Sequence, residues 1–333
     1  MHDVFKKTQL DEEFYEKYLK SRLPERIIDC HAHIATPEIT KNISRETIEA
    51  DWALQYNTYM TVEQAKYYYD QFFPDKKVEY LALPFFCMGV DLEANNEYLS
   101  CNTDRALMAV HPNWEAEYCE TILIQKGFLG FKPYPAFVTN VKSAEISIFD
   151  FITHDQLKIL NKHKKVLMLH LPRRGRLHDD NNVYELKLIK DKYPDIKAII
   201  AHFGRSFCRS TFLKGVKKLG RDINSFFYDT TAVINPDVYK EAFPIIDHNR
   251  IMFGTDFPLT LWHGKRIWIE EQEKYINLSR EDSLWNKHIE GAEKEAKYTF
   301  FVYEQLKSIL DVAGNDKKLI DNVFYNNAIN ILK

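Results

Sequence analysis

Cysteine, glycine and proline are scarce in this chain of 333 residues, which contains 5, 11 and 12 of them, respectively. The cysteines are odd in number and scattered, and none forms a Cys-x-x-Cys pair, which favours reduced, mostly buried thiols over a disulfide framework. So few glycines and prolines exclude a linker-rich or fibrous protein. Reduced thiols are typical of the cytoplasm, where we expect this protein to reside.

An excess of charge of one sign is also lacking. The chain has 45 basic and 48 acidic side chains, for a net charge of −3 and no block of one sign, which argues against an electrostatic binder of nucleic acid or membranes. No apolar run is long enough to span a bilayer, and the first residues carry charges where a secretory segment needs an apolar core. With 45% apolar residues the chain is expected to be globular, with a small molecule as its partner.

Eight short apolar runs, enriched in β-branched and aromatic residues, predict eight strands, and stretches of helical period lie between most of them. The predicted strands lie near residues 26–33, 78–86, 105–112, 127–135, 165–172, 197–204, 225–233 and 250–258. Eight strand-then-helix units in series predict a closed parallel (β/α)8 TIM barrel of the α/β class. Because there is no internal repeat, low-complexity stretch or linker, we expect one domain over residues 1–333, with its core at about 26–332.

Three segments lie outside this pattern. They are an N-terminal helix near residues 11–22, an insertion at about 34–76 after the first strand, and a helical C-terminal tail after about residue 280. The insertion is rich in aromatic residues and would emerge at the C-terminal face of the barrel, where active sites form. Two interpretations of it stay open: a lid or pocket wall, or a helical subdomain whose aromatic side chains pack only on each other.

The end of the first strand carries the first chemical signal. Side chains on a strand alternate between its faces, so Asp29, His31 and His33 are expected to share one face. A His-x-His pair at the end of a buried strand places two imidazoles side by side, which is a start for a divalent metal site. Asp29 would either orient an imidazole through a hydrogen bond or make a structural hydrogen bond at the barrel floor.

Polar side chains also close other predicted strands. They are Lys132 on the fourth strand, His170 on the fifth, His202 on the sixth and Asp256 on the eighth. A lone histidine at the end of an apolar strand usually has a structural role, but several such groups at one rim are hard to attribute to chance. Burying imidazoles and a carboxylate together costs free energy unless a metal or a charged partner satisfies them. The sequence therefore predicts a metal site at this rim.

Taken together, these motifs resemble the amidohydrolase superfamily over about residues 26–332. Within it, they are similar to the branch that contains aminocarboxymuconate-semialdehyde decarboxylase and its metal-dependent hydrolase relatives. The motifs are Asp29-x-His31-x-His33, Gly130-Phe131-Lys132, His170, His202-Phe203-Gly204, Gly254-Thr255-Asp256-Phe257-Pro258 and the tail at 326–332.

The resemblance implies a set of four ligands for one divalent ion, most often zinc: His31, His33, His170 and Asp256. Imidazole and carboxylate groups suit zinc or a similar ion, and an open coordination position marks a catalytic site. Asp256 would accept a proton from a metal-activated water and pass it to the leaving group. His202 would act as a general acid or base, or polarise the substrate carbonyl.

Cationic side chains at the same rim predict an anionic substrate, such as a carboxylate. Arg173 and Arg205 follow the fifth and sixth strands, and the guanidinium fork suits carboxylate recognition. Lys132 leaves two alternatives open. In binuclear relatives a carboxylated lysine at this strand bridges two metals, whereas a free ammonium would bind a substrate carboxylate.

Two reactions stay open on such a site. We expect hydrolysis of an ester, lactone or amide bond by a metal-activated water, and the alternative is non-oxidative decarboxylation or hydration of an unsaturated or aromatic-derived acid. The intact set of rim groups argues against a non-catalytic scaffold. Neither a Gly-x-Ser-x-Gly elbow nor a Gly-x-Gly-x-x-Gly turn is present, which disfavours a serine hydrolase and a dinucleotide-binding enzyme. The relatives are commonly homodimers, which makes a homodimer an expectation here.

Overall fold

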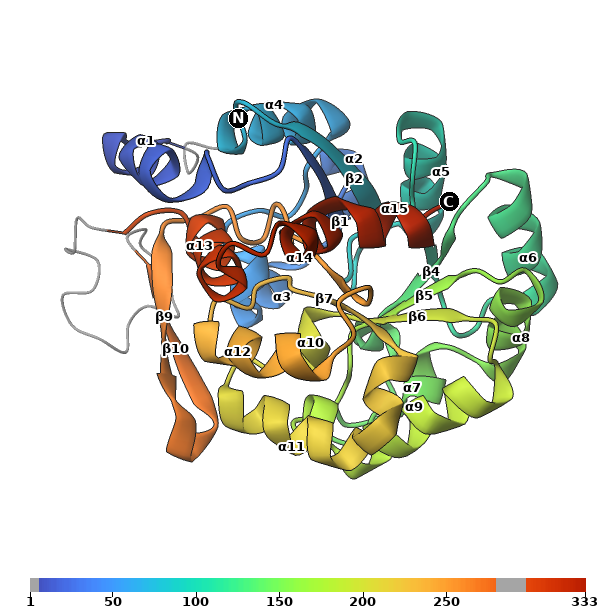
Figure 1. Cartoon of the computed structure of the whole chain (residues 1–333). Coiled ribbons are helices and arrows are strands. Elements are labelled where there is room, and N and C mark those ends of the chain that lie inside the picture. Colours follow the sequence, from blue (N-terminus) through green and yellow to red (C-terminus); the bar gives the residue numbers. More distant parts are fainter. Residues whose placement is uncertain (1–5, 280–297) are drawn as a thin grey trace.

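Eight parallel strands form the centre of the computed structural model, which describes residues 6–279 and 298–333 (Figure 1). The strands are β1 (Arg26–His33), β2 (Lys77–Leu83), β3 (Met108–Val110), β4 (Gly130–Pro133), β5 (Val166–Leu169), β6 (Lys197–Ile200), β7 (Phe227–Asp229) and β8 (Ile251–Met252). Strands β3 to β8 pair in sequence order, and β1 pairs with β2. Parallel bridges Ala82–Ala106 and Ala32–Phe257 join the two sheets at both edges. The sheet therefore closes, and the predicted TIM barrel is confirmed.

Alternation along the strands divides the apolar side chains into two layers. In β5, Leu167 and Leu169 belong to the large cluster between strands and helices, whereas Val166 and Met168 belong to a second cluster with residues of the other strands. Both faces of these strands are buried, which explains their near-continuous apolar sequences. Ala328 and Ile331 of the C-terminal helix also join the second cluster.

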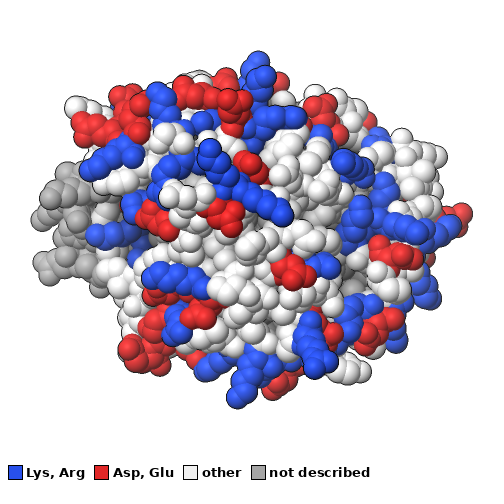
Figure 2. Space-filling model, in the orientation of Figure 1, with Lys and Arg blue, Asp and Glu red and all other residues white. Residues whose placement is uncertain are grey.

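Helices follow the strands and cover the barrel. They are α5 (Leu92–Asn102), α6 (Ala116–Gln125), α7 (Ile148–Phe151), α8 (His154–Lys162), α9 (Asp180–Lys192), α10 (His202–Arg205), α11 (Arg209–Leu219) and α12 (Pro236–Ile245). Capping residues define several of their starts: the Thr153 hydroxyl accepts a hydrogen bond from the Gln156 amide at the start of α8, and Asn235 caps α12. Lys and Arg are interspersed with Asp and Glu over the face shown in Figure 2, in keeping with the balanced composition.

The insertion after β1 packs on the barrel rather than only on itself. It contains α2 (Pro37–Thr40), α3 (Arg45–Ala50), the short η2 (Trp52–Leu54) and α4 (Val62–Phe72). The rings of Tyr69 and Phe72 lie 5.6 and 4.9 Å from the ring of Phe257, measured between centroids. Asp51 and Ala53 line a cavity at the end of the barrel. The insertion is therefore in part a pocket wall, and its aromatic side chains mainly complete the core.

The terminal segments are helical, as expected. The N-terminal segment forms α1 (Gln9–Phe14) and η1 (Tyr15–Leu19), and the C-terminal one forms α13 (Phe301–Ala313), α14 (Lys317–Asp321), η9 (Asn322–Asn326) and α15 (Asn327–Ile331). The predicted tail begins at about residue 280, and its first part, 280–297, lies outside the described residues. Among the helices of 6–279 and 298–333, none has the length and apolar character needed to cross a membrane.

An antiparallel hairpin after β8 was not predicted. Strands β9 (Gly264–Ile269) and β10 (Lys274–Ser279) form it, and Figure 1 shows it in orange beside the barrel. The 3-10 turn η6 (Glu270–Gln272) joins the strands, and Glu273 closes this turn with a φ of 54°. Tight hairpins are usually signalled by Asn or Gly at left-handed positions, and here a glutamate occupies that position.

Candidate active site

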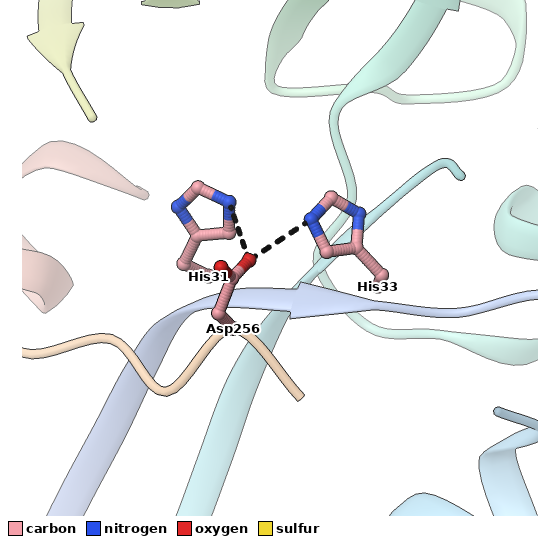
Figure 3. Close-up of side chains that lie close together, drawn as sticks. All are labelled: His31, His33 and Asp256. Atoms are coloured by element: carbon pink, nitrogen blue, oxygen red, sulfur yellow. Dashed lines mark ion pairs between the residues drawn. The ribbon is translucent and has the colours of Figure 1, made fainter. Parts of the chain in front are cut away.

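Two histidines and an aspartate meet at the C-terminal end of the barrel. His31 and His33 rise from the end of β1 and flank the carboxylate of Asp256, which follows β8 (Figure 3). The Nε2 atoms of His31 and His33 lie 3.4 and 3.2 Å from Oδ1 of Asp256. All three side chains are buried, and their ligand atoms lie within 4.8 Å of one another. Three of the four predicted ligands therefore lie close together.

Hydrogen bonds on the far side of each ring aim the imidazoles. Nδ1 of His31 lies 3.0 Å from Oδ2 of Asp229, and Nδ1 of His33 lies 2.8 Å from the carbonyl oxygen of Pro84. Since both partners are acceptors, each Nδ1 carries the proton, and each Nε2 presents its lone pair to the shared site. Burial, assisted by the charge of Lys132, lowers the pKa of His31 to about 3. His31 is therefore neutral at neutral pH, the form that binds a metal.

Asp229, at the end of β7, was missed in the sequence. Its Oδ1 atom accepts hydrogen bonds from the backbone amides of His202 at 2.7 Å and Thr231 at 3.1 Å, while Oδ2 holds His31. Burial alone would raise the pKa of Asp229, but the neighbouring imidazole of His31 and its hydrogen bond hold it below its ordinary value. The available signal was an aspartate closing an apolar strand, as at Asp256.

Asp29 has the structural role that was one of its two interpretations. Its carboxylate accepts hydrogen bonds from the Tyr69 hydroxyl at 2.6 Å, from the Thr255 amide at 2.9 Å and from the backbone amide of His31 at 2.9 Å. The register between β1 and β2 shifts between Asp29 and Ala32, so regular alternation does not continue from Asp29 to His31. Burial raises the pKa of Asp29 to about 6. Asp29 thus ties β1 to the segment after β8 and orients no imidazole.

His202 and His170 lie beside this group. The ring of His202 is 4.9 Å from that of His31 and 5.2 Å from that of His170, measured between centroids. Nδ1 of His202 lies 3.1 Å from the carbonyl oxygen of Thr231, so its Nε2 carries the lone pair when the ring is neutral. Burial lowers the pKa of both histidines. His170 is outside the compact group of His31, His33 and Asp256, and its role as a fourth ligand stays a prediction.

A left-handed turn directs two predicted residues to the site. Residues His202–Arg205 all have positive φ, between 46° and 66°. This conformation is unfavourable by about 1–2 kcal/mol for each residue other than glycine. A side chain at Gly204 would meet Leu177 at 2.7 Å, so glycine is needed there for space as well. Strained backbone of this kind is concentrated at functional sites, and here it brings both His202 and Arg205 to one cavity.

Lys132 of β4 is a buried cation without a hydrogen-bond partner. Its Nζ atom is among the buried polar atoms of the described residues that lack one, and it lies 5.3 Å from the centre of the Tyr134 ring. Burial lowers the pKa of Lys132 to about 8, against the opposing attraction of Asp229 and Asp256. Such a group in a cavity marks a site for an anionic ligand.

These groups line one cavity of about 220 Å³. Its lining contains six of the predicted site residues together with Arg205: His31, His33, Lys132, His170, His202 and Asp256. Four aromatic rings complete much of the wall: Phe86, Tyr134, Phe207 and Tyr275. Arg173 is not part of this lining, and its guanidinium donates hydrogen bonds to the carbonyl oxygens of Glu145 and Ile146. The structure therefore brings the predicted residues together, with the exception of Arg173.

The donor set fits a divalent metal ion. Two buried imidazoles with exposed lone pairs and an ionised carboxylate are ligands for zinc and related ions. Burial would raise the pKa of Asp256, but the neighbouring imidazoles of His33, His31 and His202 hold it below its ordinary value. A cation would satisfy the lone pairs of His31 and His33 and the carboxylate together.

Comparisons with known proteins agree with this chemistry. The sequence profile of the amidohydrolase family matches residues 28–282, and no curated protein matches the chain. The fold is similar to that of 5-carboxyvanillate decarboxylase from Novosphingobium aromaticivorans, a complex with manganese and 4-hydroxy-3-methoxy-5-nitrobenzoic acid. That likeness has a TM-score of 0.58 at 12% identity and covers 98% of this chain and 99% of the decarboxylase.

A second similar structure is described as a probable 2-pyrone-4,6-dicarboxylic acid hydrolase from Acinetobacter baumannii with citric acid bound. Its TM-score is 0.55 at 12% identity, and the match covers 92% of this chain and 98% of that one. Likenesses at such low identity establish the fold alone, whereas the profile match extends over most of the chain. The chain belongs to the amidohydrolase family, whose members are metal-dependent enzymes.

Proposed function

We propose that this protein is a metal-dependent hydrolase that cleaves an ester, lactone or amide bond of a small anionic substrate. The convergence of His31, His33 and Asp256, with ligand atoms within 4.8 Å, supports this proposal above all. These residues would hold one divalent ion, with His170 as the fourth ligand, and zinc suits the donor set. When bound, such an ion supplies Lewis-acid chemistry, lowering the pKa of water and polarising a carbonyl group.

Proton transfer falls to Asp256 and His202. The pKa of Asp256 is below its ordinary value, so its carboxylate is ionised at neutral pH and can accept the proton of the attacking water. The same carboxyl group then passes the proton to the leaving group. Neutral His202 presents a lone pair at Nε2, because its Nδ1 proton is held by the Thr231 carbonyl oxygen. It would therefore accept a hydrogen bond from the attacking water and hold it for Asp256, rather than donate a hydrogen bond that polarises the carbonyl.

The anionic part of the substrate would bind to Lys132 and Arg205. Both line the cavity, and the Lys132 ammonium has no hydrogen-bond partner of its own. A charge-assisted hydrogen bond from either cation to a carboxylate is about twice as strong as a neutral one. Arg173, whose guanidinium is engaged by backbone carbonyl oxygens outside the cavity, is no longer proposed as a substrate contact.

Decarboxylation of an aromatic-derived acid is the second candidate. The four rings in the cavity wall, together with Lys132, would accommodate a carboxylated ring, and 5-carboxyvanillate decarboxylases share the fold. The same candidate ligands could anchor a carboxylate instead of activating water.

One assay separates the two reactions. The zinc-loaded and manganese-loaded proteins are incubated with panels of lactones, esters, amides and aromatic carboxylic acids, and acid formation and CO2 release are measured in parallel. We expect hydrolysis without CO2 release. CO2 release without hydrolysis would select the second candidate instead. Elemental analysis accompanies the assay: one ion per chain is expected, whereas two ions and a lysine heavier by one CO2 would indicate a carboxylated Lys132.

A further inference from the structure

A second, larger cavity adjoins the first. It has a volume of about 750 Å³ and lies between the loop after β5 and the β9–β10 hairpin. Arg205 and Tyr275 line both cavities, so they form the boundary between them. We call this second space the outer cavity. Four of its lining residues carry a permanent positive charge: Arg174, Arg176, Arg205 and Lys274.

Among the described residues, three arginines in or next to this boundary lack a carboxylate partner. Within the described residues, none of Arg176, Arg205 and Arg266 has an ion pair of 4.0 Å or less. Their hydrogen bonds go to neutral oxygens instead: Arg176 Nη1 donates to the Arg205 carbonyl at 3.1 Å, and Arg205 Nη1 to the Leu171 carbonyl at 3.1 Å. Arg266 donates through Nη1 to the Ala232 carbonyl at 2.7 Å. The cations are thus positioned but not neutralised.

Arg266 is the most deeply buried of the three. Only 3% of its surface is exposed, and its Nη2 atom has no hydrogen-bond partner. Its guanidinium lies 4.7 Å from the ring centre of Phe207 and 4.3 Å from that of Tyr275, which both line the inner cavity. Arg266 therefore packs against the rings of Phe207 and Tyr275 and supports this part of the cavity wall.

The arginines repel one another. Burial and the charge of Arg176 lower the pKa of Arg205 to about 10, and the same two causes lower that of Arg266 to about 10. Among the described residues of the outer lining, Glu273 is the one acid, and Lys214 and His178 already engage it. Like charges that are half-buried or buried raise the free energy of the protein unless an anion approaches them.

We infer that the outer cavity binds a second acidic group of the substrate, and that the substrate is therefore a small dianion such as a dicarboxylate. This inference rests on the proposed function, in which the reacting end lies in the inner cavity beside His31, His33 and Asp256. The second carboxylate would contact Arg176 and Arg205, while Arg266 acts as a positioning residue. A guanidinium pair without acids is suited to bidentate carboxylate recognition.

Calorimetry with matched probes tests this inference. Succinate, glutarate, adipate and isophthalate are each titrated into the zinc-loaded full-length protein, and each is compared with the monocarboxylate in which a methyl group replaces one carboxylate. We expect at least one diacid to bind about tenfold or more tightly than its monocarboxylate. Arg176→Gln should reduce that ratio to about twofold or less and leave the affinity for the monocarboxylate unchanged. Arg221→Gln, an exposed substitution outside both cavities, should keep the wild-type ratio.

The outcomes distinguish this inference from the proposed function. If no diacid is preferred, or if Arg176→Gln weakens diacid and monocarboxylate binding equally, the outer cavity is no acidic-group site, although metal binding and hydrolysis can stand. If Arg176→Gln does not fold, Lys274→Gln, an exposed change in the same lining, must lower the ratio in its place. If the wild-type protein did not bind a divalent metal ion, the proposed function would instead be overturned.

Discussion

Among the described residues, we compare two buried clusters that combine an aspartate with histidine, of which the one at the barrel end adjoins the inner cavity. In the first, Asp11 of α1 accepts hydrogen bonds from His263 Nε2 at 2.9 Å, from the Thr299 hydroxyl at 2.9 Å and from the Phe300 amide at 3.1 Å. Asp11 and His263 are both 0% exposed. This cluster joins the N-terminal helix to the segments before α13 and β9, and its role is to stabilise the fold.

The second cluster is the candidate metal site, where the polar groups are left incomplete. The Nε2 lone pairs of His31 and His33 face a cavity, and the Nζ atom of Lys132 has no hydrogen-bond partner. Buried polar groups in folded proteins are normally paired, so incomplete pairing beside a cavity indicates a ligand. Residue type and burial are alike in the two clusters. The difference in pairing separates a stabilising cluster from the candidate metal site.

Of the substitutions considered, Asp256→Asn should have the largest effect, a loss of turnover at the candidate metal site. The amide keeps the shape of the side chain but loses the charge and the proton-accepting oxygen. We expect turnover of the substrate found in the panel to fall by at least about 10³-fold, within the usual range for a lost general base. Circular dichroism and the free energy of unfolding should change little. Retention of turnover within about tenfold would contradict the assignment of Asp256.

Asp11→Ala should produce the opposite pattern. Removing this carboxylate leaves His263, Thr299 and Phe300 with buried donors that lose their acceptor, and breaking such a buried pair costs about 3–5 kcal/mol. Urea unfolding measures the loss, and metal affinity should stay unchanged. Asp311→Ala, which removes an exposed partner of Arg22, is the matched control and should cost less than about 1 kcal/mol. Equal losses for the two variants would mean that the Asp11 cluster adds no special stability.

Asp229→Asn should have a smaller effect, on metal affinity. Its Oδ1 atom must keep accepting from the amides of His202 and Thr231, so the new Nδ2 would donate to Nδ1 of His31. The proton of His31 would then move to Nε2 and remove the lone pair that faces the site. Loss of such an orienting partner weakens metal binding by about 10–100-fold. Competition with a zinc chelator measures this, and Asp237→Asn, at an exposed ion pair, serves as the control.

The sequence predicted the candidate metal site better than the cluster of Asp11 and His263. Strand-end position predicted that His31, His33 and Asp256 share one rim, because parallel strands in a barrel deliver their C-terminal residues there. Their role as metal ligands was implied by the resemblance to the amidohydrolase superfamily. Asp11 lies on a short helix, and its partner His263 lies 252 residues away. No local pattern encodes such a contact. The expectation that Asp29 shares a strand face with His31 and His33 was wrong, because an irregularity in the pairing of β1 interrupts the two-residue period between Asp29 and Ala32.

The outer cavity could not be predicted from the sequence either. It depends on the β9–β10 hairpin, whose turn carries Glu273 at a positive φ instead of the usual glycine or asparagine. Arg266 has the sequence context of an ordinary surface arginine, and only the packing of Phe207 and Tyr275 around it reveals a buried cation. The strands of the barrel and their polar ends are local features, whereas these contacts arise from tertiary packing.

The smallest expected effect concerns Lys132 and the pH dependence of anion binding at the candidate metal site. Because burial lowers its pKa to about 8, the ammonium attracts an anion below this pH and loses that attraction above it. We expect the affinity of the zinc-loaded protein for benzoate to fall about threefold to tenfold between about pH 7 and 9, equivalent to ~1 kcal/mol. Lys132→Met should bind more weakly at pH 7 and lose this pH dependence. An equal fall in both proteins would assign the titration to another group and remove Lys132 as the anion contact.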